Sequence, residues 1–413
     1  MRLSEYARSR DNNFTLLRLL AALTVIMFHS GACLGIEGGK DFLFAHIGRS
    51  FGEMAVDMLF VVSGFLVTAS LFNRGDLNHF LWARALRLYP ALWLMLPLTV
   101  FLLGASLTTL PLKDYFGSRA TWDYVYKVGT VVSGMRYGLP GVFDSMPVKA
   151  AFNGSLWTLP IEARMYIYLA VGWLAFSLTP RLRVPALSVI APVAAIAMIL
   201  PVIRAHAYVA TGVGNGDTAI LMFCFGASLY FWRERLFINW VTFAALPLIV
   251  IAAALIDRTL AFTAYLICLP PFLLHLAYIP GGRIRAVNNW GDYSYGVYIY
   301  AFPVQQTLAL LFPKLTAIAM SLSAGAISLG LAFCSWNLVE KRAMGLKDVC
   351  ANATAGAFER GLDKARTLLG WPPFAPEKGT GEAGHFAGED RRRVALTGNA
   401  PRTLAAIFRV RRL

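Results

Sequence analysis

The fold of this chain is decided by residues 14–30, which read FTLLRLLAALTVIMFHS. The segment is apolar and long enough to enter a lipid bilayer, yet it carries Arg18 near its start and His29 near its end. In a helix, eleven residues advance by about 1100° and about 16 Å, so the two side chains lie on nearly the same face. Ionisable groups inside a membrane span are costly and usually face a cavity or the bundle interior. The pair on one helix face therefore favours a functional role for both residues. In the alternative, Arg18 snorkels to the lipid headgroups and His29 is merely interfacial.

Composition places the whole chain among multi-pass membrane proteins. Of its 413 residues, 57% are hydrophobic and only 15% are charged, and the mean hydropathy is +0.57, outside the soluble globular range. The net charge of +15 is spread over short loops between apolar segments, which favours contact with a cytoplasmic membrane leaflet over nucleic acid as a partner. The five cysteines are scattered and show neither metal-ligand spacing nor a disulfide framework, so no metal is expected.

Apolar windows of about 17–25 residues recur along the chain and predict about ten transmembrane helices. The expected spans are 14–35, 54–72, 88–108, 157–178, 185–203, 217–232, 238–256, 259–279, 293–312 and 315–338. With a cytoplasmic N-terminus, the basic residues concentrate in the short cytoplasmic loops, as the positive-inside rule requires, and an even number of spans returns the C-terminus to the same side. The sequence therefore predicts an all-α polytopic membrane protein with both termini in the cytoplasm.

The composition changes after the last span. Residues 1–342 form the predicted membrane domain, and residues 343–413 form a basic, weakly structured cytoplasmic tail with an Arg391–Arg393 run. The segment 404–409 is compatible with a short amphipathic helix on the membrane surface, and a disordered solubilising tail is an equally good interpretation.

Three ionisable residues are expected at one depth, near the outer end of their spans: His29, Asp57 and Glu162. A histidine beside carboxylates can act as a general base on a hydroxyl, because its pKa lies near neutrality and a carboxylate fixes its tautomer. The pair Ser63 and Gly64 lies in mid-membrane, where small residues permit close helix packing, and packing alone explains them best.

Two arginines, Arg84 and Arg87, lie on one helix face at the cytoplasmic surface, beside Arg18. Such a pair can clamp phosphates through bidentate hydrogen bonds, or it can simply anchor the helix to the inner leaflet. The separation of roughly 16 Å between Arg18 and His29 is comparable to an extended pantetheine arm. We infer that a cytoplasmic acyl-CoA is able to thread its thioester toward an acceptor at the other face.

These residues resemble the motifs of the membrane-bound acyltransferase family 3, whose members O-acylate surface polysaccharides, lipopolysaccharide, peptidoglycan and Nod factors. Arg18 and His29 match the family's R-x10-H element, and further segments match in the family's order across residues 12–342. The matching segments are Val56–Phe65, Arg84–Arg87, Ser155–Glu162, Ser294–Pro303 and Val339–Lys341. Residues 12–17 and 162–166 depart from the commonest family pattern, which favours an exopolysaccharide-type subgroup.

The resemblance implies a bacterial inner-membrane O-acyltransferase that moves an acyl group, expected to be acetyl, from acyl-CoA to a sugar hydroxyl of a cell-surface glycan or a lipid-linked precursor. It implies an essential His29 oriented by Asp57 or Glu162, and acyl-CoA contacts from Arg18, Arg84 and Arg87. Residues in or beside the matching segments are the expected acceptor-binding set: Asn153, Ser155, Trp157 and Tyr298.

Two interpretations from other classes remain at this point. A transporter or glycan-lipid flippase would use His29, Asp57 and Glu162 as a proton relay. It would be expected to show broken helices in paired halves, and the sequence lacks such a repeat. A scaffold in a glycan assembly complex explains the number of spans but not the aligned ionisable residues.

Overall fold

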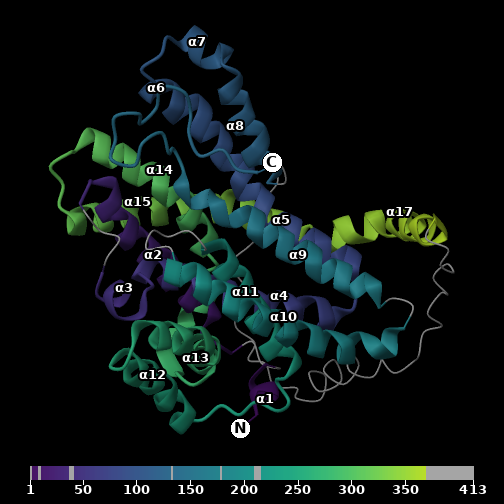
Figure 1. Ribbon diagram of the computed structural model, residues 1–413. Coiled ribbons are helices and arrows are strands. Elements are labelled where there is room, and N and C mark those ends of the chain that lie inside the picture. Colours follow the sequence, from purple (N-terminus) through teal and green to yellow (C-terminus); the bar gives the residue numbers. More distant parts are fainter. Residues whose placement is uncertain are drawn as a thin grey trace, which may run out of the picture. The chain divides into compact units, whose positions relative to one another are not determined.

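The computed structural model describes residues 2–7, 11–36, 41–131, 134–176, 179–208 and 215–368, and all regular structure in these ranges is helical. The chain divides into two compact units, Met1–Ala353 and Thr354–Leu413, whereas the sequence places the boundary after residue 342. Each predicted membrane span coincides with a helix in the first unit (Figure 1). The all-α fold is therefore confirmed for the described residues.

The helices at the ten predicted spans have clear boundaries. They are α2 (Phe14–Cys33), α4 (Phe51–Arg74), α5 (Leu77–Pro97), α9 (Thr158–Ala175), α10 (Pro180–Tyr208), α11 (Asn215–Phe231), α12 (Trp240–Ala254), α13 (Arg258–Tyr278), α14 (Ser294–Leu311) and α15 (Ala317–Ser335). A π-helix, Leu98–Gly104, carries α5 on into α6 (Ala105–Leu107), and another, Trp336–Glu340, carries α15 on into α16 (Lys341–Gly345).

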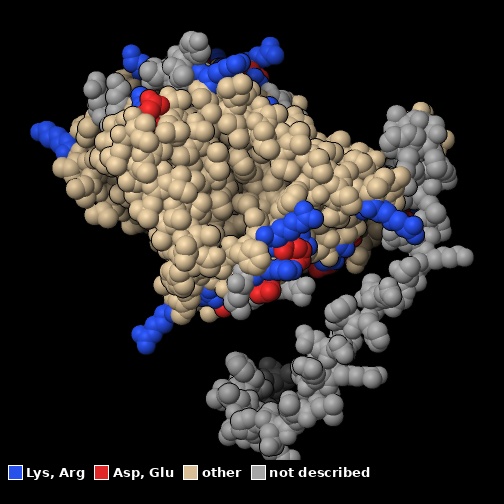
Figure 2. Space-filling model, turned by 60° about the horizontal axis from the view of Figure 1, so that its bottom comes forward, with Lys and Arg blue, Asp and Glu red and all other residues tan. Residues whose placement is uncertain are grey.

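Six helices in the described part of the chain are long and apolar enough to cross a membrane. They start at Phe14, Phe51, Leu77, Pro180, Arg258 and Ala317, and α11 and α12 are shorter apolar helices. The number of ten spans and the side on which the termini lie stay predictions. Figure 2 shows a broad face with Lys and Arg at its edges and a wide area without charged side chains between them. A surface without charged side chains suits contact with lipid.

Capping residues fix where the helices begin and end. Ser50 and Glu53 form a capping box at the start of α4, and Gly75 ends that helix with a φ of 72°. Asp76 then accepts a hydrogen bond from the backbone N–H of His79 and starts α5. The buried Asn13 side chain donates to the carbonyl groups of Leu276 and Pro280, so the start of α2 is tied to the end of α13.

Glycines bring α4 and α11 into close contact at the centre of the unit. A Cβ on Gly64 would lie 2.1 Å from the carbonyl oxygen of Phe223, and a Cβ on Gly226 would lie 2.2 Å from that of Val61. Only glycine permits two backbones to approach this closely. The close packing expected at Ser63 and Gly64 is therefore present at Gly64.

Helix α2 packs against both α4 and α14 (Figure 1). Near its start Arg18 pairs with Asp292, which precedes α14, and near its end Ile26 and Ser30 accept hydrogen bonds from Gln305. Because both helices advance in the same direction between these contacts, α2 and α14 run parallel. The Arg18 end of α2 therefore lies beside the start of α14, and the His29 end of α2 lies toward the end of α14.

The long loop predicted between residues 109 and 156 is folded. It contains α7 (Leu112–Gly117), α8 (Arg119–Thr130) and a one-turn 3-10 helix, Gly154–Trp157. The carbonyl groups of Gly129 and Thr130 accept hydrogen bonds from Trp93 and Tyr89, so α8 lies along α5. The core of this folded 109–156 segment consists of the fully buried side chains of Tyr115, Tyr124 and Phe152.

The remaining helices are short or follow the membrane domain. They are α1 (Leu3–Ala7), α3 (Phe42–Ile47), the 3-10 helix Gly282–Asn289 and α17 (Lys347–Leu368). The sequence predicts a weakly structured tail from residue 343, but residues 347–368 form a helix. Arg391–Arg393 and the predicted surface helix 404–409 lie outside the described residues.

Candidate active site

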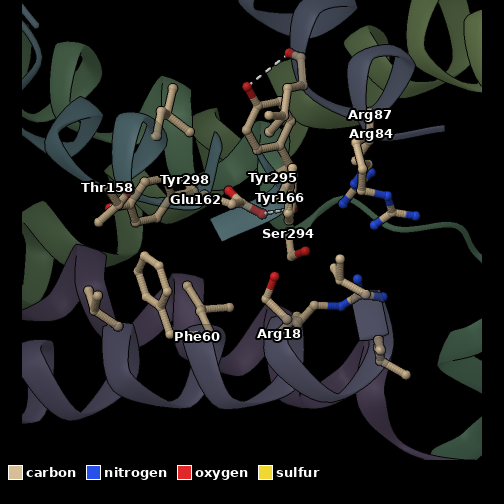
Figure 3. Close-up of a pocket in the computed structure, with 17 residues that line it drawn as sticks. Arg18, Phe60, Arg84, Arg87, Thr158, Glu162, Tyr166, Ser294, Tyr295 and Tyr298 are labelled. Atoms are coloured by element: carbon tan, nitrogen blue, oxygen red, sulfur yellow. Dashed lines mark hydrogen bonds between the residues drawn. The ribbon is translucent and has the colours of Figure 1, made fainter. Parts of the chain in front are cut away.

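A cavity of about 120 Å³ lies between α2, α4, α5, α9 and α14 (Figure 3). This is enough for several water molecules or a small acyl group. One wall is apolar and comes from α4, with Val56, Leu59, Phe60, Leu66 and Val67. The polar lining residues are Arg18, Ser63, Arg84, Arg87, Thr158, Glu162, Tyr166, Ser294, Tyr295 and Tyr298. The cavity therefore brings together four of the residues to which the sequence analysis assigns a catalytic or donor-binding role: Arg18, Arg84, Arg87 and Glu162.

Two of the three arginines share one carboxylate. Asp292 Oδ2 lies 3.1 Å from Arg18 Nη2 and 2.6 Å from Arg87 Nη2, and Arg87 also lies 3.8 Å from Glu340. Burial alone would raise the pKa of Asp292, but attraction to both arginines and hydrogen bonds from Ser294 outweigh it and lower the pKa to about 2. Asp292 is thus a carboxylate at any physiological pH.

Arg84 has different surroundings from Arg87. Its guanidinium lies over the rings of Phe80 and Tyr166, at 5.9 Å and 5.7 Å from their centroids, and it has no ion pair within the described part of the chain. The Nε atoms of Arg18 and Arg84 are buried without a hydrogen-bond partner among the described residues. Buried donors of this kind favour an anionic ligand that accepts hydrogen bonds from them.

His29 lies outside the residues that line the cavity. It is half-buried, its Nδ1 lies 3.0 Å from the carbonyl oxygen of Val25, and its ring packs edge-on against Phe28 and Phe302. A carbonyl oxygen can only accept, so Nδ1 carries the proton and Nε2 of the neutral ring has a free lone pair. This tautomer leaves Nε2 as the ring nitrogen that can accept a proton.

The predicted contact between His29 and a carboxylate is absent from the described part of the structure. Asp57 is completely buried and accepts hydrogen bonds from Arg49, at 2.8 Å, and from Tyr265, at 2.7 Å. A buried carboxylate needs such partners, and Arg49 and Tyr265 satisfy it fully. The hydrogen bond that fixes the tautomer of His29 therefore goes to the Val25 carbonyl, and not to Asp57 or Glu162 as the sequence predicts.

Glu162 lies about one helical turn after the start of α9, as the sequence predicts. It accepts a hydrogen bond from Tyr166 and lines the cavity together with Arg18, Arg84 and Arg87 (Figure 3). The residue therefore belongs to the arginine end of the cavity and not to the His29 end.

A row of side chains on α14 leads from the arginines to His29. Ser294, Tyr298 and Phe302 are spaced by four residues, which places them on one helix face. Ser294 and Tyr298 line the cavity, and the Phe302 ring contacts the His29 ring at a centroid distance of 5.4 Å. The arginine end of the cavity and His29 thus lie at the two ends of one row of side chains on α14.

Of the four predicted acceptor-binding residues, only Tyr298 lines the cavity. Asn153 is buried, donates to the Ile299 carbonyl at 2.8 Å and accepts from the Ser155 backbone. Ser155 offers its carbonyl to the Tyr298 hydroxyl at 2.9 Å. Both residues hold the turn before α9 against α14, and Trp157 is half-buried in the same turn.

Sequence reasoning missed Asp292 and Glu340 as members of the site. Asp292 lies two residues before Ser294, next to the N-cap residue Tyr293 of an apolar helix, and its carboxylate accepts a hydrogen bond from the Ser294 hydroxyl. Glu340 stands in a segment that was matched to the family, but nothing near it in the sequence indicates its distant partner Arg87. No group of three or more metal-ligating side chains occurs among the described residues.

The model of the acyltransferase 3 family, described as an acyltransferase domain, matches residues 11–337. The chain belongs to this family. The match covers most of the membrane domain and contains every cavity-lining residue. The protein is therefore an acyltransferase and, with its apolar helices, a multi-pass membrane protein.

Three curated relatives agree with this family assignment. The chain is 32% identical over 341 residues to an O-acetyl transferase of Shigella phage Sf6, which covers 81% of this chain and 96% of the relative. It is 24% identical to nodulation protein 10 of Rhizobium leguminosarum bv. viciae, over 40% of this chain and 45% of the relative. It is 28% identical to the peptidoglycan O-acetyltransferase OatA of Listeria monocytogenes, over 43% of this chain and 26% of the relative. No solved structure matches the chain significantly.

Proposed function

We propose that this acyltransferase moves an acetyl group from cytoplasmic acetyl-CoA to a sugar hydroxyl of a cell-surface glycan or exopolysaccharide precursor at the bacterial inner membrane. Acetyl as the transferred group is supported by two relatives that are named O-acetyltransferases, one of which carries peptidoglycan in its name. A sugar hydroxyl as acceptor fits the same names, because O-acetylation requires an oxygen nucleophile.

The observation that carries this proposal is the arrangement of three arginines at one end of the cavity and of His29 at the far end of the row of side chains on α14, with no hydrogen-bond partner for Nε2 among the described residues. Guanidinium groups bind phosphate oxygens through paired hydrogen bonds, so Arg18, Arg84 and Arg87 suit the phosphates of CoA. An extended donor then directs its thioester toward His29, which lies roughly 16 Å further along α2.

The chemistry at the His29 end needs one base. Nε2 removes the proton from the acceptor hydroxyl while that oxygen attacks the thioester carbonyl carbon, so a C–O bond forms and the C–S bond breaks. The CoA thiolate leaves and takes the proton from the imidazolium ring. In this scheme Glu162 offsets part of the positive charge of the arginines, and Asp57, with Arg49 and Tyr265, ties the first turns of α4 to α13.

A matched pair of histidine variants tests the proposal. His46 also places Nδ1 near the carbonyl oxygen four residues earlier, at 2.9 Å, and its ring also packs on an aromatic neighbour. It differs from His29 in that it is exposed on α3, whereas the His29 ring contacts Phe302 of α14. We expect His29→Ala to abolish glycan acetylation and His46→Ala to retain it, with both proteins at wild-type levels in the membrane.

The measurement is mass spectrometry of surface glycans from a deletion strain that is complemented with each variant, together with acetyl-CoA hydrolysis by the purified proteins. Full acetylation with His29→Ala would refute the proposed base. A glycan that is unchanged by deletion of the gene would refute the proposed acceptor.

A further inference from the structure

Asp292 stands where three elements of the site converge. It precedes α14, and its Oδ2 atom contacts Arg18 from α2 and Arg87 from α5. Because both Nη2 atoms contact this one oxygen, at 3.1 Å and 2.6 Å, they lie at most 5.7 Å apart. Two guanidinium groups at this distance repel each other unless a negative charge lies between them. The carboxylate of Asp292 supplies that charge.

The carboxylate is itself held in place. Its Oδ1 accepts hydrogen bonds from the hydroxyl of Ser294, at 2.6 Å, and from the Ser294 backbone N–H, at 3.4 Å. The residue before it, Gly291, has a φ of 110° and lies under Trp336, whose Nε1 would be 2.5 Å from any added Cβ. Residue 291 therefore has to be glycine, and the two hydrogen bonds from Ser294 hold the Asp292 carboxylate toward the arginines.

Arg87 is held on its other sides as well. Its guanidinium lies over the rings of Tyr295 and Trp336, at 5.6 Å and 5.9 Å, and it faces Glu340. Arg18, in contrast, has Asp292 as its only carboxylate partner in the described part of the chain. Removal of Asp292 therefore changes the position of Arg18 most, and it changes the spacing between the two arginines.

We propose that Asp292 is a positioning residue, which holds Arg18 and Arg87 at the spacing that receives the phosphate groups of the acyl donor. This inference rests on the proposed use of acyl-CoA. It assigns Asp292 no contact with the reacting atoms, so its loss weakens donor binding and leaves the chemical step at His29 intact.

The test compares acetyl-CoA hydrolysis by the full-length wild type and by Asp292→Asn, Asp292→Glu and Asp348→Asn, each purified in detergent. Asp348 is the matched control, since it pairs with Arg74 at 2.8 Å but lies away from the cavity with about half of its side chain exposed. We expect Asp292→Asn to raise KM for acetyl-CoA about tenfold, the equivalent of about 1.4 kcal/mol, with kcat little changed. Asp292→Glu keeps the charge and is expected to lie between wild type and Asp292→Asn, and Asp348→Asn is expected to match wild type.

Several results would overturn the inference. A folded Asp292→Asn protein with wild-type KM, or with reduced kcat at unchanged KM, contradicts a positioning role, and a lower KM means that Asp292 competes with the donor for the arginines. If Asp292→Asn does not fold, Asp292→Glu decides the matter in the same way, because it displaces the carboxylate without loss of charge. A wild-type protein that neither binds nor consumes acetyl-CoA would instead refute the proposed donor, and this inference with it.

Discussion

Arg84 and Arg87 occupy adjacent positions on one face of α5, yet their environments predict different results when each is replaced. Arg87→Gln removes the cationic partner of the buried Glu340 and leaves Arg18 as the only ion-pair partner of Asp292 among the described residues. Loss of one member of a buried ion pair costs about 3–5 kcal/mol, so we expect a clearly lower midpoint of thermal unfolding. Arg84→Gln breaks no ion pair among the described residues and removes contacts with Phe80 and Tyr166, worth about 0.5–1 kcal/mol each, so we expect nearly wild-type stability.

Both arginine variants are expected to bind acetyl-CoA more weakly. Thermal unfolding in one detergent, with and without acetyl-CoA, separates stability from binding, because a ligand stabilises only the variants that bind it. If Arg84→Gln and Arg87→Gln lost equal stability, this would contradict our inference that Arg87 is ion-paired and Arg84 has no ion pair among the described residues.

At the scale of single residues, the sequence predicts which side chains share a helix face better than it predicts their partners. The spacing of Arg18 and His29 correctly indicates one helix stripe, because both lie on one continuous helix. The partners of Asp57 are Arg49, on a segment outside the predicted span, and Tyr265, more than 200 residues away. Periodicity carries no information about such long-range contacts. A helical histidine that bonds its own backbone, as His29 does at Val25, needs no partner from another helix.

The crossing of α4 and α11 gives a prediction about whole elements. Since a Cβ on Gly64 would lie 2.1 Å from a backbone oxygen, Gly64→Ala must push the helices apart and disturb the apolar wall of the cavity that α4 provides. We expect a loss of about 1–3 kcal/mol in stability, the usual cost of overpacking, and reduced acetyl transfer.

Gly325→Ala is the control for this crossing, because Gly325 lies inside α15 with nothing within 4 Å of an added Cβ. Alanine in a helix interior is favoured over glycine by about 1 kcal/mol, so we expect equal or higher stability. Thermal unfolding and glycan acetylation measured for both variants check the prediction. Wild-type behaviour of Gly64→Ala would show that the two helices tolerate a wider crossing.

Helices are predicted well here, whereas the segment between α6 and α9 is not. Each apolar window became a helix because the hydropathy and length of a window are local properties. In contrast, α8 has an ordinary amphipathic sequence, and its position along α5 depends on hydrogen bonds from Tyr89 and Trp93. The same limit applies to α17, whose polar sequence suggests a loose tail although it is helical.

For the whole molecule, the parallel course of α2 and α14 means that one measurement of sidedness orients the site. Arg283 precedes α14 and is predicted to be cytoplasmic, and Lys314 follows it and is predicted to be outside. Both are exposed. The arginine end of the cavity lies on the side of Arg283, and His29 lies toward the side of Lys314.

Cysteine labelling decides between the two orientations. In a parent that lacks the five native cysteines, we expect Lys314→Cys to react with a membrane-impermeant maleimide in intact spheroplasts, and Arg283→Cys to react only after the membrane is permeabilised. This result places Arg18, Arg84 and Arg87 next to the cytoplasm, where acyl-CoA is made, because a charged nucleotide does not cross the bilayer unaided. The reverse pattern would place the arginines outside, and a donor other than cytoplasmic acyl-CoA would then be required. The start of α14 lies beside the arginines, and Phe302 further along α14 contacts His29. The orientation of this one helix in the membrane therefore determines the direction of acyl transfer.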